Sequence, residues 1–196
     1  MAKSNRRQQI LGALAAMLQE HPGDRITTAA LAARVGVSEA ALYRHFPSKA
    51  KMLEGLISFA EETLFSRINL ILNEQNEAAS RCRNIVYLLL SFVERNPGFA
   101  RLFVGDALQG ENERLRGRMH QLMNRLETQL RQVLREHNAR LVEMPTIQIN
   151  ASANLLLALA EGRIQQFVRS EFSVPPTQDW EAQWSVLNKA LFGSEN

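Results

Sequence analysis

Apolar residues recur at intervals of three and four positions along nearly the whole chain, and no segment shows the alternation that a β-strand requires. The first such stretch, residues 5–20, places Ile10, Leu14, Met17 and Leu18 on one helical face. Proline, glycine and capping residues divide the rest into predicted helices at about 28–34, 38–45, 48–73, 78–95, 97–107, 111–139, 145–170 and 178–192. The periodicity therefore predicts an all-α fold of about nine helices.

Two of the predicted helices are very short and are separated by a single glycine. Gly36 can adopt a positive φ at little cost, and Ala32 is small enough for the two helices to cross closely. Thr27 and Ser38 stand where N-caps are expected. Together with the first helix, this pattern predicts a helix-turn-helix head whose third helix faces outward. Similar glycine-linked pairs also occur in bundles that bind no DNA.

The charges are distributed unevenly along the 196 residues. Residues 1–51 carry 8 Lys/Arg and 3 Asp/Glu, a net charge of +5, whereas residues 54–113 carry 5 and 9, a net charge of −4. Lys49 and Lys51 lie in the first turn of the long helix that Ser48 is expected to cap, where positive charge opposes the helix dipole. A phosphate bound at this helix end would reverse the penalty. We therefore expect an anionic partner for the head, and double-stranded DNA in particular.

Several other classes of protein find no support in the sequence. The single cysteine, Cys82, excludes an internal disulfide, and the four histidines show no metal-ligand spacing. Arg81 and Arg83 flank Cys82 and are expected to lower its pKa, but no general base is identifiable near it. No apolar run is long enough to span a bilayer, and the basic N-terminus has no separate apolar block. We expect no catalysis, no metal, no cofactor and no membrane span, in a cytoplasmic protein.

The segment Val37-Ser-Glu-Ala-Ala-Leu-Tyr-Arg-His-Phe-Pro-Ser-Lys49 resembles the signature of the TetR family of bacterial regulators. Five further segments resemble the members of that family that act in nucleoid occlusion: Asn5-Arg-Arg, Arg25-Ile-Thr-Thr, Glu94-Arg-Asn-Pro-Gly, Gln129-Leu-Arg-Gln-Val-Leu-Arg-Glu and Phe167-Val-Arg-Ser-Glu-Phe. The resemblance implies a helix-turn-helix domain, residues 1–47, and a helical dimerisation and partner-binding domain, residues 48–196. It also implies a nucleoid-associated dimer that binds palindromic chromosomal sites, antagonises polymerisation of the tubulin-like protein FtsZ and blocks septum formation over the nucleoid.

The candidate DNA contacts come from the resemblance and agree with the expected outward face of the head. They are Thr27, Thr28, Ser38, Ala40, Tyr43, His45, Lys49, Arg6 and Arg7. Thr28, Tyr43 and Lys49 are expected to bind phosphates, whereas Ser38 and Ala40 are expected to lie against base edges. Arg6 and Arg7 either follow the DNA or form a solvated tail, and His45 either contacts DNA or ends its helix against Phe46.

Two apolar stripes near the C-terminus are candidates for the homodimer interface. The candidate residues are Leu155, Leu159, Gly162, Phe167, Trp180, Trp184 and Leu187. By resemblance, the last two helices of each protomer form a four-helix bundle, which lets a two-fold dimer place its heads on successive major grooves. Alternatively, both stripes complete the core of one protomer.

A candidate surface for FtsZ lies on the long helix and near the break at residues 96–97. It comprises Phe59, Arg67, Arg95, Asn96 and Arg101, an aromatic residue beside several arginines, which suits a peptide with apolar and acidic side chains. The alternative is ordinary packing for Phe59 and solvation for the arginines.

Two alternatives concern the body as a whole. A ligand-responsive repressor, the usual role in this family, would hold a small molecule among residues such as Phe92, Phe99, Phe103 and Met119, which core packing explains equally well. The arginine-rich stretch from Arg114 to Arg135 suggests a second nucleic-acid surface, although a solvated helix with one core face explains its spacing better.

Overall fold

The computed structural model describes residues 2–20, 26–111, 113–141 and 146–193. The predicted breaks at 21–24 and at Pro145 lie outside these residues. The described chain is helical and contains no strand. Its helices are α1 (Ala2–Glu20), α2 (Thr28–Val35), α3 (Glu39–His45), α4 (Lys49–Glu74), α5 (Ala78–Arg95), α6 (Pro97–Phe103), α7 (Glu113–Leu141), α8 (Thr146–Arg169) and α9 (Trp180–Phe192), with a 3₁₀ turn, η1 (Asp106–Leu108).

The three capping residues predicted from the sequence occupy their expected positions. The hydroxyls of Thr27, Ser38 and Ser48 accept hydrogen bonds from the backbone amides of Ala30, Ala41 and Lys51, each at 3.2 Å. Gly36 ends α2 in the left-handed conformation, with φ 71°. These local interactions define the boundaries of the short helices, which are too short to be stable alone.

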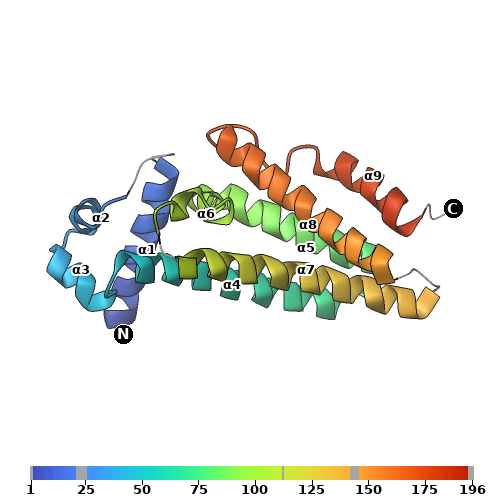
Figure 1. Cartoon of the computed structure of the whole chain (residues 1–196), viewed down its shortest axis with the longest axis horizontal. Coiled ribbons are helices and arrows are strands. Elements are labelled where there is room, and N and C mark those ends of the chain that lie inside the picture. The colour runs from blue at the N-terminus through green and yellow to red at the C-terminus, as the bar shows by residue number, and fades with distance from the viewer. Residues whose placement is uncertain (1, 21–25, 112, 142–145, 194–196) are drawn as a thin grey trace.

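The head lies at one end of an elongated molecule, and the body extends away from it (Figure 1). Helices α4 and α7 run side by side along the body, α5 packs against both, α8 packs against α5 and α7, and α9 packs against α5 (Figure 1). One continuous core joins the two parts, because α1 of the head packs against α4 and α6. Among the described residues, no helix combines the length and apolarity needed to cross a membrane.

The helix predicted at 97–107 is shorter in the structure. Helix α6 ends at Phe103, and Gly105, with φ 82°, turns the chain into η1. A residue with a side chain is strained at that φ, so the glycine interrupts the helix.

Ion pairs join α4 to the arginine-rich helix α7. Glu54 pairs with Arg114 at 3.1 Å, and Glu61 pairs with Arg118 at 2.9 Å and also with Arg125. The Arg125 guanidinium lies 4.0 Å from the centre of the Phe65 ring. These arginines hold two helices of the body together, which favours a structural role for them over a second nucleic-acid surface.

Candidate nucleic-acid and partner interfaces

The outward face of the head is formed by α2, the turn after it and α3. Thr27, Ser38, Ala40 and Tyr43 are exposed, and Tyr43 is 41% exposed. The hydroxyls of Thr27 and Ser38 accept capping hydrogen bonds, yet each retains a proton to donate to a phosphate or base. Four of the predicted DNA contacts therefore lie together on one accessible face.

Polar side chains connect the two short helices across this face. The Tyr43 hydroxyl donates to Thr28 Oγ1 at 3.2 Å, and the Thr28 hydroxyl donates to Glu39 Oε2 at 2.7 Å. The chain of bonds orients Tyr43 and Thr28, two of the three residues expected to bind phosphate. Glu39 was not predicted to take part, because the sequence does not show which α2 side chain meets it.

Arg7 interacts with the head itself. Its guanidinium donates to the carbonyl oxygen of His45 at 2.9 Å and lies 4.3 Å from the centre of the Phe46 ring. It thereby satisfies a carbonyl at the C-terminus of α3, which favours a structural role over a solvated tail. His45 is partly buried, and its Nδ1 atom has no hydrogen-bond partner among the described residues. Arg6 is also partly exposed.

Lys49 is paired across the junction between head and body. Its Nζ atom lies 3.0 Å from a carboxylate oxygen of Glu111, which precedes α7. Both side chains are partly buried. A phosphate bound at the start of α4 would therefore compete with Glu111 for the Lys49 ammonium group.

A groove lies between the head and the body. It has a volume of about 440 Å³, and Phe59, Arg95, Asn96 and Phe99 line one side of it. The Phe59 side chain is 50% exposed, and its ring centroid lies 5.9 Å from that of Phe99. Three residues of the predicted partner surface, Phe59, Arg95 and Asn96, thus meet at one concave site.

The opposite wall of the groove was missed in the sequence analysis. It is formed by one face of α1 that carries only small or uncharged side chains: Gln8, Leu11, Gly12, Ala15, Ala16 and Gln19. The recurrence of Gln8, Gly12, Ala15 and Gln19 at intervals of three and four was the available signal. Gly98 lies beneath this wall, so close that an added Cβ would be 2.1 Å from the carbonyl oxygen of Ala15.

Arg101 was predicted to lie on the partner surface, and that prediction was wrong because the residue is buried. Arg67, predicted for the same surface, is exposed. Arg101 is 2% exposed, and its Nε donates to Asp106 Oδ2 at 2.8 Å. Its Nη1 donates to the carbonyl oxygen of Leu18 at 3.1 Å, near the end of α1. Arg101 therefore supports the junction between α1 and α6 from inside and is not accessible to a partner. Arg67 does not line the groove.

The candidate dimer residues divide into two groups. Phe167, Trp180 and Trp184 are buried within the protomer, so the alternative of core packing is correct for them. The centroid of the Trp180 ring lies 6.2 Å from that of Tyr87 and 5.8 Å from that of Trp184, and the rings are tilted relative to one another. Leu155 is 50% exposed, Gly162 is exposed, and Leu159 and Leu187 are partly exposed. Val186, 71% exposed on α9, was not predicted.

Phe92, Phe99 and Phe103 pack against one another in the body, and Cys82 is a buried thiol. Phe92 packs edge-on against Phe99 at 5.2 Å and Phe103 at 6.3 Å, as core side chains do. Burial raises the pKa of the Cys82 thiol to about 12, and nearby Arg81 lowers it by less. The expectation of a lowered pKa was therefore wrong, because desolvation of the thiolate outweighs the flanking charge.

Two family models match the chain. Residues 10–56 match the model described as bacterial regulatory proteins, tetR family, and residues 76–192 match an SlmA-like model described as tetracyclin repressor-like, C-terminal domain. The nucleoid occlusion factor SlmA of Idiomarina loihiensis is 56% identical over 192 residues, which cover 98% of each chain. The protein of the same name from Colwellia psychrerythraea is 59% identical over 185 residues, 94% of this chain and 93% of its own.

A solved structure shares the fold at much lower identity. The transcriptional regulator FadR from Bacillus subtilis, crystallised in complex with stearoyl-CoA, has a TM-score of 0.79 and 15% identity to this chain. The match covers 96% of this chain and 99% of FadR. At this identity the likeness concerns the fold alone.

Proposed function

This chain belongs to the TetR family of bacterial regulators, in its SlmA-like branch, and on that premise we propose that it is a nucleoid occlusion factor. It is a DNA-binding regulator rather than an enzyme. As a dimer bound to palindromic chromosomal sites, it antagonises FtsZ polymerisation and so blocks septum formation over the nucleoid. Its place of action is the cytoplasm, at the nucleoid. The observation that carries the proposal is the near full-length identity of 56–59% to proteins named as nucleoid occlusion factors.

Residues 1–47 serve as the DNA-binding domain. Ser38 and Ala40, exposed at the start of α3, lie against base edges in the major groove, and Tyr43, Thr28 and Lys49 bind phosphates. The exposed face formed by α2 and α3 supports these roles. Thr27 and Arg6 contribute further backbone contacts, and Arg7 and His45 hold the end of α3 in place.

Residues 48–196 serve as the dimerisation and partner-binding domain. A single head reads only half of a palindrome, so two protomers must present their heads about 34–36 Å apart or at a multiple of that spacing. The exposed Leu155 and Gly162, with the partly exposed Leu159 and Leu187, support an interface through α8 and α9. The buried Phe167, Trp180 and Trp184 belong to the core of these two helices instead of the interface.

The groove between head and body holds a segment of FtsZ. Phe59 offers an aromatic surface, Arg95 offers a positive charge, and Asn96 lies beside it. Such a groove fits an extended peptide that carries apolar side chains and a carboxylate. Because α1 forms one wall, a shift of the head on DNA alters the groove. Thermodynamic linkage then requires that DNA changes the affinity for FtsZ by the same factor as FtsZ changes the affinity for DNA.

Charge reversal at the groove tests the partner site. We expect Arg95→Glu to weaken FtsZ binding at least about tenfold, since a carboxylate would then face a carboxylate, while DNA affinity stays unchanged. Arg135→Glu, at an exposed position of α7 outside the groove, is the matched control and should leave both affinities unchanged. Arg67→Glu reports whether the site extends along α4. An unaltered FtsZ affinity in Arg95→Glu would remove the groove from the proposal.

A further inference from the structure

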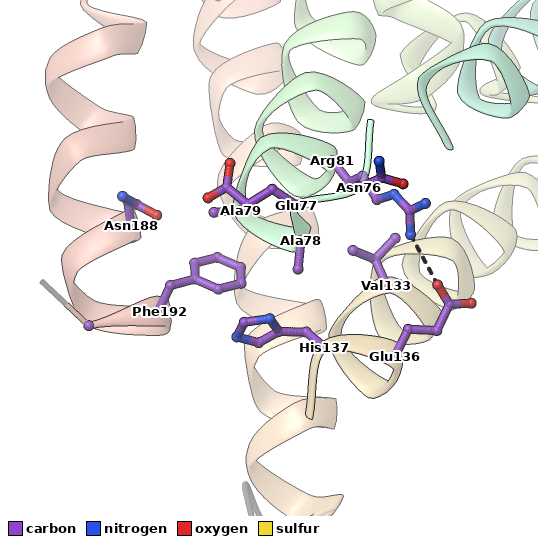
Figure 2. A pocket seen from close by; sticks show the side chains of 11 residues that line it. Asn76, Glu77, Ala78, Ala79, Arg81, Val133, Glu136, His137, Asn188 and Phe192 are labelled. Atoms are coloured by element: carbon purple, nitrogen blue, oxygen red, sulfur yellow. Dashed lines mark hydrogen bonds and ion pairs between the residues drawn. The ribbon is translucent and has the colours of Figure 1, made fainter. Parts of the chain in front are cut away.

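A second cleft lies at the end of the body that is remote from the head. It has a volume of about 490 Å³ and is bounded by the turn between α4 and α5, by α7 and by the last turns of α9 (Figure 2). Glu77, Glu136, His137, Asn188 and Phe192 project from these elements around it (Figure 2). The volume lies within the range of small-molecule sites, and none of these residues is among the candidates for DNA or FtsZ binding.

The guanidinium group of Arg81, which lines the cleft, makes one hydrogen bond through each of its three nitrogen atoms. Arg81 Nε donates to the carbonyl oxygen of Gln75 at 2.7 Å, and its Nη2 donates to that of Leu72 at 2.8 Å. Its Nη1 donates to Glu136 Oε2 at 3.1 Å (Figure 2). Arg81 therefore neutralises Glu136 and the C-terminus of α4, and it is poorly placed to receive an anion.

Hydrogen-bond acceptors remain in the cleft. The Oδ1 atom of Asn188 is buried and has no hydrogen-bond partner among the described residues, which is costly unless a donor is supplied. Glu77 accepts a hydrogen bond from the Ser80 hydroxyl, which leaves its negative charge uncompensated by any ion pair among the described residues. The cleft thus combines an unpaired carboxylate with an acceptor that lacks a donor.

Helix ends also affect whether the cleft favours a cation or an anion. Helices α4 and α9 both terminate at the cleft. The last carbonyl groups of α4 already bond Arg81, so it is the negative end of the α9 dipole that favours a cation. The N-terminus of α5 has the opposite effect, but Glu77 stands at that end. Apolar side chains supply the rest of the wall: Ala78, Ala79, Val133 and Phe192, whose ring meets that of His137 edge-on at 5.5 Å.

We propose that this cleft binds a small protonated aliphatic amine. The ammonium group donates to Asn188 Oδ1 and is attracted by the Glu77 carboxylate, while the hydrocarbon part packs against Val133 and Phe192. Among the described residues, His137 and the Arg81–Glu136 pair complete the set of charged or titratable groups that line the cleft. The site is separate from the aromatic core of the body, where Phe92, Phe99 and Phe103 fill the interior.

Calorimetric titration of the full chain with 1,4-diaminobutane tests the proposal. At about pH 8 we expect saturable binding with a Kd of about 1 mM or lower. Butane-1,4-diol has the same carbon chain without the charge and should give no saturable binding. The absence of saturable heat with the diamine, or equal binding of the diol, would overturn the proposal.

Variants locate the binding. Glu77→Gln should weaken binding about threefold to tenfold, because an attractive charge is lost, whereas Asn188→Asp should tighten it by a similar factor. A gain of affinity cannot arise from misfolding, so Asn188→Asp keeps the test decisive. Glu74→Gln, at an exposed position near the end of α4 but outside the cleft, is the matched control. Equal affinities in all variants would contradict the site.

Discussion

Individual side chains set the local structure of the head, and many of these were predictable. The caps at Thr27, Ser38 and Ser48 follow from residue type and position alone, because each acts within three residues of itself. Arg101 was not predictable, because its burial depends on Leu18, which lies 83 positions earlier. Sequence patterns report interactions within a helix well, and they report the partner of a long side chain poorly.

The Lys49–Glu111 pair leads to a prediction about DNA binding. Lys49→Ala should weaken binding and lower the slope of log affinity against log salt by about 0.9 for each half-site, since one phosphate contact is lost. Glu111→Gln should bind DNA as tightly as the parent chain or more tightly, because the ammonium group is released. Fluorescence anisotropy over a range of salt concentrations measures both, and an unchanged slope in Lys49→Ala would exclude it as a phosphate contact.

Burial of Cys82 leads to a prediction about its reactivity. Because the Cys82 thiol has a pKa of about 12 and is not exposed to solvent, it should not react with a disulfide reagent at about pH 8 while the protein is folded. Reaction should appear together with unfolding in denaturant, as followed by absorbance and circular dichroism on the same samples. Rapid labelling of the folded protein would show that the thiol is accessible.

At the scale of helices, periodicity predicted the number and order of the elements, and the structure differs mainly in which faces pair. Trp180 and Trp184 form a stripe on α9 that suits a dimer interface or a core equally well, and only the position of α5 shows that they are buried. The wall of the groove on α1 was missed for the same reason. A helix face of small residues can be identified as the wall of a groove only when the structure shows that no neighbouring helix covers it.

The crossing of α1 and α6 depends on Gly98. We expect Gly98→Ala to lower the free energy of unfolding by about 1–3 kcal/mol, because its Cβ would lie 2.1 Å from the Ala15 carbonyl oxygen and the backbone must move. Gly117→Ala, where an added Cβ meets nothing within 4 Å, should raise it by about 0.5–1 kcal/mol through helix propensity. Urea denaturation measures both, and equal effects would contradict the close crossing.

For the whole molecule, the proposed function requires a DNA-binding head, a partner site and a dimer interface to be coupled in one arrangement. The head and body share one core, and the groove is lined by α1 on one side and by α4 and the α5–α6 corner on the other. The family resemblance predicted this combination of functions from the sequence, whereas the position of the groove between the two parts required the structure.

The exposed face of α8 leads to a prediction about assembly. Leu155→Glu should convert the dimer to a monomer at micromolar concentration, because burying an unpaired carboxylate in an apolar interface is unfavourable. Sedimentation equilibrium gives the mass, and affinity for a palindromic site should fall with it. Arg169→Glu, at an exposed position near the end of α8, shows whether any added negative charge on this helix has the same effect. A dimer that persists in Leu155→Glu would place the interface elsewhere.

The most direct test of the account is the sedimentation of FtsZ polymers with this protein, with and without a DNA fragment selected for tight binding from its own genome. We expect polymer to be lost only when that DNA is present. Unchanged polymer in both samples, with DNA binding confirmed, would contradict division control and favour a ligand-responsive repressor.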